Sequence, residues 1–281
     1  MDMFRNPKLS AAVYASQKTP RSPSDIVLEV SSGMALGDLP GGAPTACWVF
    51  TNAESVRLYR GNDYIAAFSP DRHGRFAAMP HPPIEINDFV GSLLEKYEGM
   101  DPPSAQAVAA ILNDMRRCAM ELSPLSKARM LSLRLSWNEV ARMYCKYIGI
   151  LGSPSPVYRF EAIWHGRVVG TVVREPVQSV RLECTVHNPI LTDGPTWDCA
   201  AVSLRAIDQN GNLLPYCGEA VQLRVDGPLK IIGPSVVPLR GGMAGTYLAT
   251  TGEAGRAVLH CRMEGALDTD AVLTIRSREN G

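Results

Sequence analysis

Short segments in which apolar and polar residues alternate dominate the later part of the sequence. A period of two places one row of side chains in a core and the other in water, as in a β-strand. Glycine-containing turn signals separate the segments, at residues 210–212, 226–228, 241–242 and 251–252. Short strands at this spacing, with no helical pattern between them, predict an antiparallel β-sandwich over residues 181–281. Its expected core residues are Val180, Leu182, Cys184, Val186, Val202, Leu204, Val221, Leu223, Val225, Leu259, Cys261, Met263, Leu273 and Ile275.

Two hairpin patterns predict another sandwich earlier in the chain. Residues 46–68 alternate on both sides of a turn at 60–63, which contains the glycine and asparagine that tight hairpins require. Residues 157–174 repeat the pattern around a turn at 165–166. We therefore expect these hairpins to form the two halves of one sandwich domain, over residues 21–180.

Helical periodicity interrupts this β pattern at about residues 88–150. Apolar residues recur there at three- to four-residue spacing, which places them on one face of a helix. Ser123-Pro124 is a typical helix start, with proline at the first helical position. We expect three helices with a small core of their own, inserted between the halves of the first sandwich, so that residues 86 and 157 lie close together. Replacing this insertion by a short linker should then leave the sandwich folded.

A further short helix is predicted over residues 4–17, with Ala11, Ala12, Tyr14 and Ala15 available for packing. A helix of this length is unstable alone in water. Another part of the protein must therefore cover it.

Composition limits the class of protein. The 281 residues, at 30.5 kDa, suit two domains. The 28 Lys and Arg balance the 28 Asp and Glu, which argues against nucleic acid or an anionic membrane surface as the main partner. No apolar run approaches the roughly 20 residues of a membrane span, and no signal-peptide pattern is visible. Seven scattered cysteines without a CxxC pair indicate free thiols in a reducing cytoplasm.

Several segments resemble a known enzyme family. Residues 48–68, WVFTNAESVRLYRGNDYIAAF, and 157–173, VYRFEAIWHGRVVGTVV, are similar to the two halves of a β-sandwich in β-galactosidases of glycoside hydrolase family 2. Residues 201–216 and 221–259 resemble the C-terminal sandwich of such enzymes, and residues 1–17 resemble the last helix of their catalytic barrel.

The resemblance implies a mainly β fold. Two immunoglobulin-like antiparallel β-sandwich domains would follow a barrel-helix remnant, with an α-helical insertion in the first sandwich. The remnant would occupy residues 1–20, the first sandwich 21–180 with its insertion at 88–150, and the C-terminal sandwich 181–281.

The resemblance also implies that no catalytic residue lies in this chain. In the family, two glutamates on the barrel act as acid/base and nucleophile, about 5 Å apart, and the resemblance places both outside the sequence. Asn138-Glu139 copies the family's acid/base dipeptide but lies within a helical pattern, whereas catalysis needs the carboxylate at the mouth of the barrel. We interpret Glu139 as a solvated helix residue near Arg142.

Three aromatic residues near turns are candidates for stacking on a sugar face: Trp164, Trp197 and Tyr216. Burial against a neighbouring domain is the commoner fate of such residues. His73 and His81 share a loop without a ligand pattern, so we expect no metal site. We also expect no cofactor, because the glycines at 241–245 do not connect a strand to a helix as a dinucleotide loop does.

These observations predict a non-catalytic accessory region of a β-galactosidase-like glycosidase. Its expected partner is the catalytic barrel of the same enzyme, where it would shape the cleft rim, with β-galactoside contact and homo-oligomer contacts as further roles. One alternative is a free-standing carbohydrate-binding module. Another is a protein-interaction module formed by the helical bundle.

Overall fold

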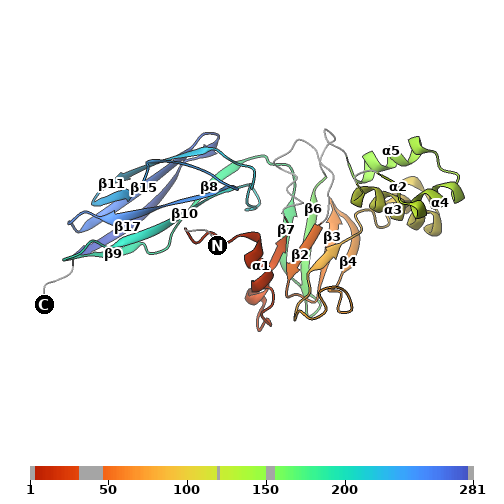
Figure 1. Cartoon of the computed structure of the whole chain (residues 1–281), viewed down its shortest axis with the longest axis horizontal. Coiled ribbons are helices and arrows are strands. Elements are labelled where there is room, and N and C mark those ends of the chain that lie inside the picture. The colour runs from red at the N-terminus through yellow and green to blue at the C-terminus, as the bar shows by residue number, and fades with distance from the viewer. Residues whose placement is uncertain (1–3, 32–46, 119–120, 150–155, 278–281) are drawn as a thin grey trace. The chain divides into compact units, whose positions relative to one another are not determined.

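The computed structural model describes residues 4–31, 47–118, 121–149 and 156–277. The chain divides into two compact units (Figure 1). The first unit is Leu9–Pro176, and the second unit consists of Met1–Lys8 together with Val177–Gly281. The chain therefore passes between the units twice, once near each of these boundaries.

Two antiparallel sheets form the β part of the first unit. Strands β1 (Leu28–Val30), β2 (Cys47–Thr51) and β5 (Ile84–Ile86) form one sheet in the order β1-β2-β5. Strands β3 (Ser55–Arg60), β4 (Asp63–Phe68), β6 (Tyr158–Trp164) and β7 (Arg167–Arg174) form the other, in the order β4-β3-β6-β7. The two halves that the sequence predicted thus meet where β3 pairs with β6.

Both predicted hairpins of the first unit are confirmed. The β3–β4 pair turns through Gly61, with φ 56°, and the β6–β7 pair turns through His165 and Gly166, with φ 49° and 72°. Two successive positive φ angles are the signature of a type I′ turn, whose twist matches that of the flanking strands.

Four helices lie between β5 and β6 in the described part of the chain, where three were expected. They are α2 (Leu93–Glu98), α3 (Pro102–Arg117), α4 (Pro124–Ser132) and α5 (Trp137–Tyr147), gathered beside β3 and β4 (Figure 1). The predicted third helix is divided because Ser136 caps a new helix, its hydroxyl accepting a hydrogen bond from the Glu139 amide.

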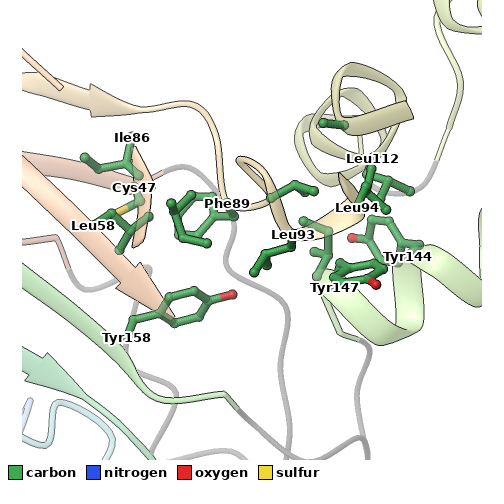
Figure 2. Close-up of a cluster of buried hydrophobic side chains, with 14 of the residues drawn as sticks. Cys47, Leu58, Ile86, Phe89, Leu93, Leu94, Leu112, Tyr144, Tyr147 and Tyr158 are labelled. Atoms are coloured by element: carbon green, nitrogen blue, oxygen red, sulfur yellow. The ribbon is translucent and has the colours of Figure 1, made fainter. Parts of the chain in front are cut away.

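The helices share one core with the sheets, so the expectation of a separate helical core is wrong. Phe89, which is fully buried, packs edge-on against Tyr158 of β6 with ring centroids 5.4 Å apart. The Arg116 guanidinium of α3 lies 4.7 Å from the centroid of the Phe89 ring. The Asn113 side chain accepts a 3.1 Å hydrogen bond from the Phe89 amide. Figure 2 shows Phe89 between strand residues such as Leu58 and helix residues such as Leu94.

Helix α1 (Leu9–Ala15) is shorter than the predicted helix over residues 4–17. Tyr14, expected to pack, is exposed. Pro7 disfavours helical backbone at the residue before it, and Asn6 instead donates a 3.0 Å hydrogen bond to the Ala244 carbonyl within the second unit. The helix end is fixed within the first unit by Gln17, whose amide exchanges two hydrogen bonds with the His81 backbone.

The second unit is a sandwich of two five-stranded sheets in the described residues. One has the order β12-β14-β10-β8-β16 and the other β13-β11-β15-β17-β9. The strands are β8 (Val180–Val186), β9 (Ile190–Asp193), β10 (Cys199–Ile207), β11 (Ala220–Asp226), β12 (Leu229–Ile232), β13 (Val236–Pro238), β14 (Met243–Thr250), β15 (Gly255–Met263), β16 (Ala266–Leu267) and β17 (Thr269–Ser277).

The pairing in the second unit is antiparallel except at two sheet edges, where β16 pairs with β8 and β17 with β9 in parallel. This departs from the purely antiparallel prediction. The consecutive strands β8 and β9 lie in different sheets, so β9 cannot fold back on β8 as a hairpin and joins the edge beside β17.

The first residues of the chain pack on the second unit. The Phe4 ring lies 5.6 Å from that of Tyr247, and the Ser203 hydroxyl donates a 2.7 Å hydrogen bond to the Phe4 carbonyl. Gly245 permits this contact, because a Cβ there would lie 2.2 Å from the Phe4 ring.

We predict that Phe89→Ala destabilises the first unit by about 3–5 kcal/mol, because it removes a fully buried ring from the junction of helices and sheets. Leu131→Ala, at a position that is 80% exposed, is the control and should change stability by less than about 0.5 kcal/mol. Urea unfolding followed by tryptophan fluorescence reports mainly this unit, since Trp48, Trp137 and Trp164 lie in it. Equal midpoints for the two variants would show that the helices do not depend on this contact.

Candidate functional site

The three aromatic residues proposed from the sequence belong to different units. Trp164 ends β6 in the first unit, half-buried, with its ring 4.2 Å from that of His165. In the second unit, Trp197 is 60% and Tyr216 67% exposed. Trp197 precedes the nine-residue strand β10 and Tyr216 follows it, and nine residues of strand span about 30 Å. These two side chains therefore lie toward opposite ends of the sandwich.

A groove of about 560 Å³ in the first unit combines aromatic and charged side chains. Trp48 of β2 stands directly opposite Glu85 of β5, and both point away from the core that Cys47 and Val49 enter. Phe76 packs edge-on against Trp48, with centroids 5.9 Å apart. Asp71, Arg75 and Asn87 also line the groove.

The sequence reasoning did not single out Trp48. Its candidates were aromatic residues near turns, and Phe76, in the loop between β4 and β5, was not among them. The signal was nevertheless present, because Trp48 alternates with the apolar residues Cys47 and Val49 and must therefore face away from the core. The loop then supplies Phe76, which no strand pattern could place beside it.

A second groove, of about 890 Å³, lies over α3 and α4 and is lined by both charged and apolar residues. Two of its three carboxylates, those of Asp88 and Asp114, accept hydrogen bonds. Asp88 accepts hydrogen bonds from the Asn113 side chain at 2.7 Å and from the Val90 and Gly91 amides. The Asp114 carboxylate accepts from the Ser126 hydroxyl at 2.6 Å and from the Ser123 amide.

Asp114 is a poor general acid. Burial acts to raise the pKa of Asp114, but the hydrogen bonds from Ser123 and Ser126 outweigh it and lower that pKa. A general acid needs the opposite shift, toward neutrality. We therefore interpret the hydrogen bonds of Asp88 and Asp114 in this groove as contacts that hold the helical segment together.

Glu139 has a structural role that the sequence reasoning did not assign. It lies in the first turn of α5 and completes a capping box, accepting from the Ser136 amide at 2.8 Å and hydroxyl at 2.7 Å. These hydrogen bonds lower the pKa of Glu139, so the carboxylate stays ionised near neutral pH. As predicted, Glu139 is an exposed helix residue on which the charge of Arg142 acts, and it also caps the helix.

Within the described residues, no three His, Cys, Asp or Glu side chains gather as a metal site would require. His73 belongs to the loop that lines the Trp48 groove, where its amide donates to Asp71. None of the described helices combines the length and apolar character needed to cross a bilayer.

The chain is similar over most of its length to known β-galactosidases. No family model matches the sequence. Over 264 residues the chain is 24% identical to a β-galactosidase of Thermoanaerobacter pseudethanolicus, covering 93% of this chain and 28% of that protein. It is 27% identical over 264 residues to a β-galactosidase of Rhizobium meliloti, with 93% and 27% covered.

Solved structures show the same fold at low identity. A β-glycosidase from Bacteroides vulgatus matches with a TM-score of 0.58 at 12% identity, covering 98% of this chain and 27% of that one. A β-glucuronidase from glycoside hydrolase family 2 matches with a TM-score of 0.53 at 12% identity, with 96% and 22% covered. The chain thus carries the β-sandwich fold of a part of such glycosidases. Its predicted resemblance to glycoside hydrolase family 2 β-galactosidases is confirmed, and it spans little more than a quarter of the length of these two β-galactosidases.

The capping role of Glu139 predicts a defined pH dependence. Because its pKa is lower in the folded state than the unfolded value of about 4.3, ionised Glu139 stabilises α5 above that value, and this stabilisation is lost as the pH falls through the folded-state pKa. Glu139→Gln keeps an amide that can form the capping box but does not titrate.

We therefore expect the melting temperatures of the wild type and Glu139→Gln to differ most near neutral pH. The difference should shrink as the pH is lowered from about 5 toward about 3, as measured by thermal melts across this range. A difference that stays constant with pH would contradict the role of the charge.

Proposed function

We propose that the chain is a non-catalytic accessory portion of a β-galactosidase-like glycosidase. The observation that carries this proposal is the similarity over 93% of the chain to β-galactosidases of which it spans 27–28%. In this role the two units support a catalytic barrel encoded elsewhere in the same enzyme and contribute to its cleft rim.

The use of carboxylates in the chain supports a non-catalytic role. A retaining glycosidase needs two carboxyl groups about 5 Å apart across the scissile bond, one of them with a raised pKa. Glu139, which copies the family dipeptide, is committed to a helix cap, and its pKa is lowered. Asp88 and Asp114, which line the larger groove, accept hydrogen bonds from neighbouring amides and side chains.

Apolar side chains on the helices support a role in packing against a partner. Leu125 and Leu131 of α4 and Trp137 of α5 are exposed at 59%, 80% and 48%. Exposed apolar groups grouped on one element mark contact surfaces more often than single ones do. We propose the barrel of the same enzyme as the partner, with homo-oligomer contact as a further role and the cytoplasm as the compartment.

We predict that the chain alone does not hydrolyse an aryl β-galactoside, because the catalytic pair lies outside it in this proposal. The measurement is release of a chromogenic leaving group, with a complete family 2 β-galactosidase assayed in parallel. Turnover at the rate of that enzyme, abolished by Glu139→Gln or Asp114→Asn, would overturn the proposal.

A second candidate function is saccharide binding, as in a free-standing carbohydrate-binding module. The Trp48 groove favours it, because an aromatic face beside Glu85, Asp71 and Asn87 offers both stacking and hydrogen-bond partners for hydroxyl groups. Trp164, Trp197 and Tyr216 line none of the grooves described above.

Galactose binding should therefore weaken about tenfold in Trp48→Ala, a loss of about 1.4 kcal/mol, and stay unchanged in Trp197→Ala. Ligand-observed NMR measures the binding, with Trp164→Ala and Tyr216→Ala as further comparisons and a melting curve to verify folding. Binding that depends on Trp164, Trp197 or Tyr216 would contradict the Trp48 groove and support the aromatic residues proposed from the sequence. No binding in the wild type would leave only the accessory role.

A further inference from the structure

Two cysteine side chains face each other inside the second unit. Cys184 lies on β8 and Cys261 on β15, in opposite sheets of the sandwich, and their Sγ atoms are 3.8 Å apart. Cys184 pairs across its sheet with Leu204, and Cys261 with Leu223, both core residues. The two thiols therefore meet between the sheets, although 77 positions separate them in the sequence.

The two sulfurs are in van der Waals contact. An S–S bond is about 2.05 Å long, so bond formation requires them to approach by roughly 1.8 Å. Among the seven free cysteines, this pair alone is described with its sulfurs in contact. Of the other five, Cys47 is buried, Cys217 is half-buried, and Cys118, Cys145 and Cys199 are exposed.

We propose that Cys184 and Cys261 are a redox modification site, at which a small-molecule disulfide such as oxidised glutathione converts the facing thiols into a disulfide that links the two sheets. This proposal is independent of the proposed glycosidase role.

Cys184 is the thiol that reacts first. It is half-buried, whereas Cys261 is buried, and it lies on β8, whose outer neighbour is the two-residue strand β16 at the sheet edge. The Cys261 S–H donates to the Cys184 sulfur. This hydrogen bond lowers the pKa of Cys184. The pKa of Cys261 is raised, mainly by the same hydrogen bond and secondly by burial.

The exchange proceeds in two balanced steps. The Cys184 thiolate attacks one sulfur of the small disulfide, whose S–S bond breaks and releases one small thiolate. The Cys261 sulfur gives up its proton and attacks the Cys184 sulfur, which releases the second small thiolate. Both protein sulfurs are oxidised, the small disulfide is reduced to two thiols, and the two protons of the protein thiols end on these products.

The resulting link should stabilise the second unit. A cross-link between residues 77 positions apart restricts the unfolded chain strongly. We expect the melting temperature of this unit to rise by at least about 5 °C. Reductant should reverse the change.

The test uses the whole chain carrying Cys199→Ser, so that the tryptic peptide 182–205 contains Cys184 as its single cysteine. The protein is incubated folded with oxidised glutathione, alkylated in denaturant, digested and analysed by mass spectrometry, in parallel with thermal melts. A matched variant adds Cys261→Ala, which should stop the reaction at a glutathione adduct on Cys184.

The expected result is peptide 182–205 linked to peptide 257–262, together with the raised melting temperature. Either a stable glutathione adduct on Cys184 in the presence of Cys261, or unmodified Cys184 and Cys261 after incubation, would overturn the proposal. A link that leaves the melting temperature unchanged would overturn its stabilising role.

Discussion

The first unit depends on the contacts of one side chain, Phe89. Its ring lies against Tyr158 on the strand side and beneath the Arg116 guanidinium on the helix side. Arg116 also donates toward the Ile86 carbonyl at 3.5 Å, so the same arginine touches the strand that leads into the helices. Entry to and exit from the helical segment are therefore joined by one buried cluster, and the helices act as part of the sandwich core.

The N-terminal segment imposes a comparable constraint on the second unit. Phe4 and Asn6 contact β14, at Tyr247 and Ala244, before the chain enters α1 of the first unit. Residues at the two extremes of the sequence thus belong to one sandwich. The absence of a side chain at Gly245 gives this contact its room, so this glycine of β14 has a packing role.

The strands and hairpins were predictable because their signal is local. Alternation at Val180, Leu182 and Cys184 and the His165-Gly166 turn depend on neighbours in sequence alone. The predicted helix boundary was wrong at Ser136, where the Ser-x-x-Glu capping box is present in the sequence but a continuous helix was expected. The contacts of Phe89 with Tyr158 and of Phe4 with Tyr247 could not be predicted. Both join residues far apart in the sequence, and neither produces a periodic pattern in it.

The difference between local and long-range signals also explains why the sequence pointed to Trp197 and Tyr216 and not to Trp48. Trp197 and Tyr216 attract attention in the sequence because they stand beside turns, and the structure leaves them exposed at distant ends of one strand. A saccharide is held by a stacking face together with several hydrogen-bonding groups that converge on it, so exposure alone does not make a site. Trp48 acquires such neighbours only through folding, because pairing of β2 with β5 brings Glu85 opposite it and the loop between β4 and β5 adds Phe76. The combination of side chains in that groove therefore depends on the fold and cannot be predicted from single residues along the chain.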